Sequence, residues 1–323
     1  MEKIIDRLKN IHNESTVGII GDSVLDKYIY GKTKETDNTV FIPEKKYYYL
    51  GGAANVANNV LSKVCNMIYI SVYGYSDKAK IFNTLLKGKG LNNSIIINDN
   101  LKDISLKTRF VCNNKILIRV DEDCIKDINE NISDKLYNQV KYNIKVNKLK
   151  ILILSNYNKG CISEELHIRI KKLCKFYNVK LLVDSNQNYD YSDIFLFKPN
   201  LAEFEKITER KFSNRNELIR VGLNFKRENN IQNLLITMDK KGLIFINQTN
   251  ECIHMKSLCN KIIDSCGAGD SMIATIAACL AKDIDINSAI ELSNYSAAVC
   301  CNTLGTYAST ISDIESLWRK LNS

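Results

Sequence analysis

Short apolar runs alternate with longer helical segments along almost the whole chain, and this alternation constrains the fold more than any other feature. The runs are nearly continuous in Ile, Leu and Val, as expected for parallel strands that are covered on both faces. The segment Glu164–Phe176 between two of these runs places Leu166, Ile170 and Leu173 on one helical face. We therefore predict a doubly wound α/β sheet, with strands at Val17–Ile20, Met67–Val72, Ser94–Ile97, Ile151–Leu154, Leu181–Val183, Ile194–Phe197, Leu234–Ile236 and Leu243–Ile246.

Two stretches, residues 24–50 and 104–121, interrupt the alternation because they indicate strands with no helix between them. Asn113-Asn114 in the second stretch predicts a hairpin turn. We predict that the two stretches pair into a small sheet, a lid over the strand ends where open α/β folds bind ligands. The length of 323 residues allows one large domain or two medium ones. We expect a single domain over residues 1–323, closed by a helix with a capping box at Ser312–Glu315.

The composition is that of an ordinary globular protein with a formal net charge of +9. The basic residues are spread along the chain among acidic ones, so we expect no nucleic-acid binding, and the charge suits anionic small substrates. The eleven cysteines include no C-x-x-C pair and lie mostly in apolar surroundings, which favours buried reduced thiols and a cytoplasmic protein. No apolar run approaches the length needed to span a membrane.

The strongest functional signal is the segment Asp264–Asp270, DSCGAGD, which is followed by a helical apolar run. A Gly-Ala-Gly turn that opens a helix, here Gly267, Ala268 and Gly269, exposes backbone N–H groups that bind an anion with the help of the helix dipole. Asp270 would then accept a proton from an attacking hydroxyl while the amides stabilise charge on a moving phosphoryl group. The alternative is a glycine-rich helix start whose aspartate only complements the dipole.

Three other segments carry weaker signals of the same kind. Small residues around Gly51, Gly52 and Asn55 would let a substrate approach the backbone, with Asn55 facing its hydroxyls, or would only pack a helix start. Asp22 and Asp26 follow the first strand, where carboxylates can hold sugar hydroxyls, or they are solvated loop acids.

The third segment, Lys198–Glu203, lies where a strand ends and a helix begins. Asn200 is suited to cap that helix, and Glu203 falls at the third helical position, which completes a capping box. The functional alternative is that this pair orders Mg²⁺ through water beside the phosphates of a nucleotide.

In this order and spacing, the four segments resemble the ribokinase-like PfkB sugar kinases over essentially the whole chain. Within that family the sequence is most similar to the D-glycero-D-manno-heptose 7-phosphate kinases, as GDSVLDKYIYG, LGGAANVANNV, LIRVD, LSNYNKG, KPNLAEFE and NTLGT indicate. The resemblance implies a three-layer α/β/α domain with a mostly parallel sheet and a β-lid that often mediates dimerisation. It also implies ATP and Mg²⁺ as cofactors, and it leaves open whether a monovalent cation binds as well.

The resemblance assigns roles to individual positions of this chain. Asp270 corresponds to the catalytic base, with Gly267, Ala268 and Gly269 as its anion hole, and Glu203 to the magnesium-linked acid. The sugar-binding set implied by the resemblance comprises Asp22, Asp26, Gly51, Gly52, Asn55, Arg109, Arg119, Asp121 and Asn156. The nucleotide-binding set comprises Asn200, Thr237, Gly242 and Asn294.

Departures from the heptose kinases lie on the presumed sugar side. Asn156 stands where those enzymes have an aspartate, and Asp184-Ser185-Asn186 lacks the lysine of their Asp-Pro-Lys. Cys266 replaces a threonine of the signature, but backbone amides supply the anion hole there. These changes affect the choice of sugar more than phosphoryl transfer. The alternatives are therefore another PfkB kinase, for fructose, ribose or a related sugar, and a non-catalytic sugar-binding homologue.

Overall fold

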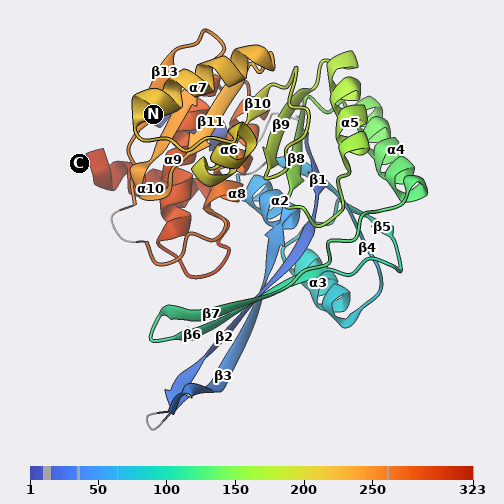
Figure 1. Ribbon diagram of the computed structural model, residues 1–323, viewed down its shortest axis with the longest axis vertical. Helices are drawn as coiled ribbons and strands as arrows, with labels where there is room; N and C mark the ends of the chain where they lie inside the picture. Colours follow the sequence, from blue (N-terminus) through green and yellow to red (C-terminus); the bar gives the residue numbers. More distant parts are fainter. Residues whose placement is uncertain (10–15, 35–36, 64, 260–261, 323) are drawn as a thin grey trace.

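The computed structural model describes residues 1–9, 16–34, 37–63, 65–259 and 262–322. Its larger sheet has nine strands in the order β13-β12-β11-β10-β9-β8-β1-β4-β5 (Figure 1). Neighbouring strands from β11 to β5 pair in parallel, whereas β12 and β13 add an antiparallel edge. The strands are β1 (Thr16–Gly21), β4 (Asn66–Tyr73), β5 (Ser94–Asn98), β8 (Ile151–Asn156), β9 (Lys180–Ser185), β10 (Leu196–Phe197), β11 (Asn233–Thr237), β12 (Leu243–Ile246) and β13 (Cys252–Met255).

Every predicted strand of the alternating pattern contributes to this sheet, and the predicted fold class is confirmed. Two details differ from the prediction. Only the last two residues of Ile194–Phe197 form a strand, and Leu243–Ile246 pairs antiparallel to its neighbour. The sequence pattern also missed β13, because this edge strand is only half-buried and lacks a continuous apolar run.

Helices cover both faces of the larger sheet, which explains why its strands are apolar on both sides. Within β1, Val17 and Ile19 pack into one core cluster, whereas Ile20 packs into the other. The helices are α1 (Glu2–Lys9), α2 (Ala53–Leu61), α3 (Asp77–Gly88), α4 (Glu130–Val146), α5 (Glu164–Phe176), α6 (Leu201–Thr208), α7 (Arg215–Glu228), α8 (Ala268–Ala281), α9 (Ile286–Cys301) and α10 (Ile311–Asn322), with a 3-10 turn η1 (Asp239–Lys241).

The strand order reverses between β1 and β8, which pair in parallel although long stretches of chain separate them. From β1 the sheet continues through β4 to β5 on one side and through β8 to β11 on the other. Open α/β sheets bind ligands in the crevice at such a reversal, outside the carboxyl ends of the strands. The fold therefore directs attention to the segments that follow Gly21 and Asn156.

A second sheet, in the order β3-β2-β6-β7, projects from the main body (Figure 1). It contains β2 (Ser23–Lys34), β3 (Asp37–Gly52), β6 (Ser105–Cys112) and β7 (Lys115–Glu122). The turn between β6 and β7 is the predicted one: Asn113 and Asn114 adopt φ values of 50° and 59°, in the left-handed region that asparagine tolerates. We call this second sheet the lid.

At the other end of the chain, the cap of α10 lies two residues earlier than the predicted Ser312–Glu315 box. Thr310 Oγ1 accepts the amide of Asp313 at 3.2 Å, and Asp313 Oδ2 accepts the amide of Thr310 at 2.7 Å. Aspartate serves here in the position that glutamate takes in the usual box. Among the described residues, no helix has both the length and the apolar character that a membrane span requires.

Candidate active site

The start of α8 lies at the crevice, and its Ala268 amide donates to the Ser265 carbonyl at 3.3 Å. Gly267 caps the helix in a left-handed conformation, with φ of 82°, and no side chain caps it. A Cβ at this position would lie 2.8 Å from Asn55 Nδ2, so both the backbone conformation and the neighbouring side chain require glycine. Because the first amides of a helix lack intrahelical acceptors and the dipole is positive there, this helix start can bind an anion.

Asp270 lies in the first turn of the same helix, and two side chains fix its carboxylate. Tyr157 donates its hydroxyl to Oδ1, and Asn55 Nδ2 donates to Oδ2 at 2.7 Å. The side chain is 8% exposed. Burial raises the pKa of Asp270 to about 6, although the hydrogen bonds from Tyr157 and Asn55 act to lower it. Asp270 thus has a hydrogen-bond partner, Tyr157, that the sequence motif alone did not reveal.

A buried ion pair lies beside the helix start. Lys198 Nζ is 2.9 Å from Asp184 Oδ2, and their side chains are 4% and 12% exposed. A Cβ placed on Gly269 would be 3.3 Å from Lys198 Nζ, so the ammonium group lies over the first turn of α8. The sequence reasoning passed over Lys198, although a lysine that ends an apolar strand was a usable signal.

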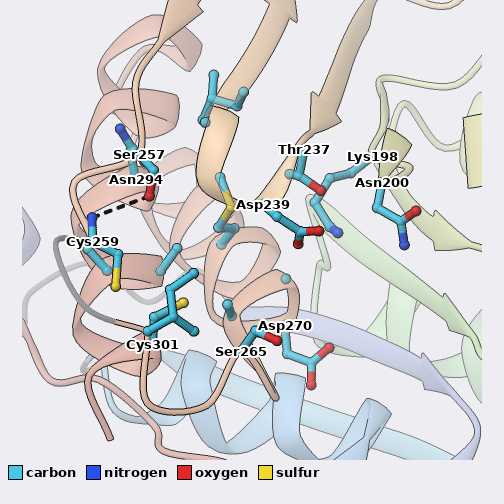
Figure 2. A pocket seen from close by; sticks show the side chains of 18 of the residues that line it. Lys198, Asn200, Thr237, Asp239, Ser257, Cys259, Ser265, Asp270, Asn294 and Cys301 are labelled. Atoms are coloured by element: carbon cyan, nitrogen blue, oxygen red, sulfur yellow. Dashed lines mark hydrogen bonds between the residues drawn. The ribbon is translucent and has the colours of Figure 1, made fainter. Parts of the chain in front are cut away.

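These groups line a cavity of about 280 Å³ (Figure 2). Lys198, Asn200, Asp239 and Asp270 lie at one end of it, and Ser257, Cys259, Asn294 and Cys301 lie at the other. The apolar part of the wall comes mainly from Leu243, Met272, Ala297 and Ala298. The cavity therefore has a charged end beside the start of α8 and apolar residues in its wall, an arrangement that suits a phosphorylated ligand with a flat ring system.

The predicted nucleotide and metal residues all line this cavity, which also contains Ala268 and Gly269. The capping box of α6 is present: Asn200 Oδ1 accepts the amide of Glu203 at 2.9 Å, and Glu203 Oε2 accepts the amide of Asn200 at 2.8 Å. Asn294 Nδ2 donates to the Lys256 carbonyl at 2.9 Å. The remaining members of the predicted set are Thr237 and Gly242.

The lid contributes a second buried ion pair, between Asp26 on β2 and Arg109 on β6. Arg109 Nη1 lies 2.5 Å from Asp26 Oδ1, and Arg109 Nη2 is 3.2 Å from Cys266 Sγ in the DSCGAGD loop. A Cβ on Gly51 would lie 2.2 Å from Asp26 Oδ2, so glycine is needed for this approach. The pair therefore connects both predicted lid segments to the loop that precedes α8.

Asp22 serves the structure of the crevice rather than presenting a free carboxylate. It is 1% exposed, and its oxygens accept the amides of Tyr157, Lys159 and Cys161 at 2.8, 3.1 and 2.9 Å. Both oxygens of Asp22 accept backbone amides in this structure, and the contact of Asp22 with a substrate stays a prediction. Gly52 supports the same turn, since a Cβ there would meet the Asp22 carbonyl at 2.4 Å.

The other predicted sugar-side residues are less closely grouped. Arg119 and Asp121 pair with each other at 2.9 Å on β7, where the Arg119 side chain is 56% exposed, so they do not join the buried pair of Asp26. Asn156 is buried at the end of β8, and its Oδ1 accepts the amide of Asn158 at 2.9 Å. Asn55 is also fully buried, and its amide group faces Asp270.

Comparison with curated proteins finds relatives over most of the chain. The chain is 29% identical over 302 residues to the bifunctional protein HldE of Helicobacter pylori strain HPAG1, and 31% identical over 315 residues to that of Aliarcobacter butzleri strain RM4018. The alignments cover 92% and 94% of this chain, which spans 65% of the length of both relatives.

Solved structures show the same fold at low sequence identity. Phosphofructokinase-2 from Escherichia coli in complex with substrates and products superposes with a TM-score of 0.78 at 15% identity, over 96% of this chain and 100% of that one. Arabidopsis thaliana ribokinase complexed with ribose and ATP gives a TM-score of 0.71 at 15% identity, over 96% and 99% of the two chains. The model of the pfkB family of carbohydrate kinases matches residues 16–313, and the chain is therefore a member of this family, a phosphotransferase that acts on a sugar hydroxyl.

Proposed function

We propose that this kinase transfers the γ-phosphoryl group of ATP to a sugar hydroxyl, with Asp270 as the general base. The observation that carries the proposal is the position of the Asp270 carboxylate, held by Tyr157 and Asn55 at the amide-rich start of α8. Each carboxylate oxygen keeps lone pairs beyond the hydrogen bond that it accepts. Asp270 can therefore still take a proton from an alcohol that approaches the helix start.

In this mechanism, an oxygen of Asp270 takes the hydroxyl proton as the sugar oxygen attacks the γ-phosphorus. The bond from that phosphorus to the bridging oxygen of ADP breaks, and ADP leaves with the bonding electrons. The amides of the α8 start and the Lys198 ammonium would stabilise the equatorial oxygens of the transferring group. The lid would exclude water while the sugar hydroxyls contact Asp26 and Asn55.

We propose that this cavity binds ATP and a magnesium ion. Its charged end would accept the phosphates, and the end near Ser257 and Asn294 the adenine ring (Figure 2). In the described part of the chain, no three His, Cys, Asp or Glu side chains gather as a metal site. The carboxylates of Glu203 and Asp184 and the side-chain carbonyl of Asn200 could offer oxygen atoms, which suits Mg²⁺ that keeps waters and phosphate oxygens as its other ligands. When bound, Mg²⁺ supplies positive charge to the phosphates.

We further propose D-glycero-D-manno-heptose 7-phosphate, phosphorylated at O1, as the acceptor. Support comes from the motif likeness to the heptose kinases and from the two HldE relatives. The test is a phosphorylation screen with this heptose phosphate, fructose, fructose 6-phosphate and ribose. A kcat/KM that is highest for another sugar would refute the heptose assignment but keep the kinase. Tight sugar binding without turnover of any sugar would favour the non-catalytic alternative.

The pH dependence of the rate tests the assignment of the base. Because the base must be ionised and burial raises the pKa of Asp270 to about 6, we expect kcat to rise with pH through a midpoint near that value. A phosphorylated acceptor also titrates near pH 6, so Tyr157→Phe is the control. The Tyr157 hydroxyl stabilises the ionised carboxylate, and its removal should move the midpoint upward. A midpoint that stays fixed in Tyr157→Phe would assign the titration to the substrate.

We also propose that the lid closes over the sugar and mediates a homodimer. It carries several exposed apolar side chains, and Ile118 and Val120 on β7 are 57% and 43% exposed. We expect Ile118→Glu/Val120→Glu to convert a dimer to a monomer in sedimentation analysis. The matched control is Tyr142→Glu/Val146→Glu on α4, where the residues are 57% and 55% exposed. A wild-type monomer, or equal effects of the two variants, would contradict the proposed interface.

A further inference from the structure

A second cavity, of about 570 Å³, lies next to the nucleotide cavity and is separate from the chemistry at Asp270. Its floor is apolar, with Leu201 and Phe212 half-buried and Leu218 and Met238 buried. Ser213, Asn214 and Ser257 also line it, and none of its described lining residues is an aspartate or a glutamate. Five basic side chains contribute: Arg215, Lys240, Lys241, His254 and Lys256. The volume is in the range of cavities that bind small organic molecules.

The cationic side chains of this cavity have no carboxylate in direct contact within the part of the chain that the structure describes. Ion pairs within 4.0 Å are recorded there for none of Arg215, Lys240, Lys241 and Lys256. The hydrogen bond from Lys211 lowers the pKa of Glu205 and the nearby charge of Lys241 adds to this, but the direct partners of the neighbouring carboxylates are other groups. Glu217 accepts the amide and hydroxyl of Ser213, and Glu205 pairs with Lys211.

Another lysine-rich cavity of the protein differs in its carboxylates. It lies beside the carboxyl-terminal end of α5 and is lined by Lys171, Lys175 and Lys180 together with Asp193. Lys171 pairs with Asp190 and Lys175 with Asp193, whereas Lys180 lies over the Phe195 ring. The site at Arg215 has no carboxylate in its described lining, and an anion would supply the missing negative charge.

One of the cationic groups is held in place. Arg215 Nη1 donates to His254 Nδ1 at 2.7 Å, and His254 Nε2 lies 3.2 Å from the Lys241 carbonyl, to which it donates in this tautomer. The imidazole ring therefore orients the guanidinium group without consuming its charge. Arg215 is also the first residue of α7, whose cap Asn214 accepts the Glu217 amide and lines the same cavity.

We propose that this cavity binds a phosphorylated ligand with a flat apolar ring. Arg215 and the lysines would bind the phosphate, and the apolar floor would contact the ring. The site shares a wall with the nucleotide cavity. Ser257 lines both cavities, and η1 directs Lys240 and Lys241 to this one while Asp239 lines the other. The chemistry required is that of an aromatic organic phosphate, because the cations match the phosphate and the apolar floor matches the ring.

Pyridoxal 5′-phosphate tests the proposal, because it joins a phosphate to an aromatic ring and marks nearby lysines. Its aldehyde condenses with a lysine amine and releases water, and borohydride then reduces the imine to a stable secondary amine. Labelling at limiting reagent, without added nucleotide, would be located by peptide mass spectrometry, and any label on Lys198 in the nucleotide cavity would be counted separately. Lys87 and Lys89, which are exposed on α3 and at its cap, provide the internal reference.

We expect Lys240, Lys241 or Lys256 to be labelled roughly tenfold faster than the reference lysines, as one charge-assisted contact to phosphate would give. Arg215→Ala should remove this preference, whereas Arg7→Ala, an exposed arginine on α1, should not. Pyridoxal without the phosphate should show no preference. Labelling at the reference rate would overturn the proposal. So would an equal preference for pyridoxal, because it would show that lysine reactivity alone directs the label.

Discussion

Asp270→Asn is expected to lower kcat at least ~100-fold, the scale of a lost general base, with a much smaller change in substrate affinity. The amide has nearly the shape of the carboxylate but cannot take the hydroxyl proton. Its single oxygen can accept from Tyr157 or from Asn55, but not from both as the carboxylate does. Part of the loss would therefore come from a less well-oriented side chain, and the larger part from the missing base.

The matched control is Asp283→Asn, which makes the same chemical change at an exposed position just after the other end of α8. Steady-state rates of both variants with the best acceptor of the substrate screen, and their thermal unfolding midpoints, separate catalysis from folding. Rates within ~10-fold of wild type for Asp270→Asn would mean that another group accepts the proton. Because Asp270→Asn removes a buried charge, electrostatics should not make the folded state of this variant less stable than that of the wild type.

The sequence predicted those parts of the fold and site that depend on neighbouring residues in the chain. The Asn113-Asn114 turn follows from the left-handed conformation that asparagine tolerates, and the capping box of α6 follows from the spacing of Asn200 and Glu203. Asp270 and the glycines before it were predictable for the same reason, because the first residues of a helix form an anion-binding site by themselves. In each of these cases the physical cause acts within a few residues.

Contacts between distant segments could not be predicted in the same way. Tyr157 approaches Asp270 because β8 ends and α8 begins at the same crevice, although the two residues are 113 positions apart in the sequence. Lys198 has Asp184 as its partner across two neighbouring strands. In the sequence, Asp22 follows a strand as a ligand-binding carboxylate would, yet its oxygens accept amides of the segment after β8. Such roles depend on which donors the fold brings to a carboxylate.

Arg109→Met is expected to lower the free energy of unfolding by about 3–5 kcal/mol, the range found when one partner of a buried ion pair is removed. Asp26 is 3% exposed and Arg109 6%, so the variant would leave the Asp26 carboxylate buried with its closest counter-ion gone. Methionine keeps most of the apolar contact that the arginine stem makes. The loss would therefore report the unpaired charge, and urea unfolding would measure it.

The double variant Asp26→Leu/Arg109→Met shows whether the charge or the packing is responsible. Removing both ions eliminates their desolvation cost together with their attraction, so it should recover most of the stability lost in Arg109→Met. Lys32→Met is the control in the same sheet. Lys32 pairs with Glu44 at 2.8 Å, but the side chains are 76% and 47% exposed, and we expect no measurable change. If Arg109→Met were as mild as Lys32→Met, water would reach the pair, and the lid would not close on the DSCGAGD loop as described.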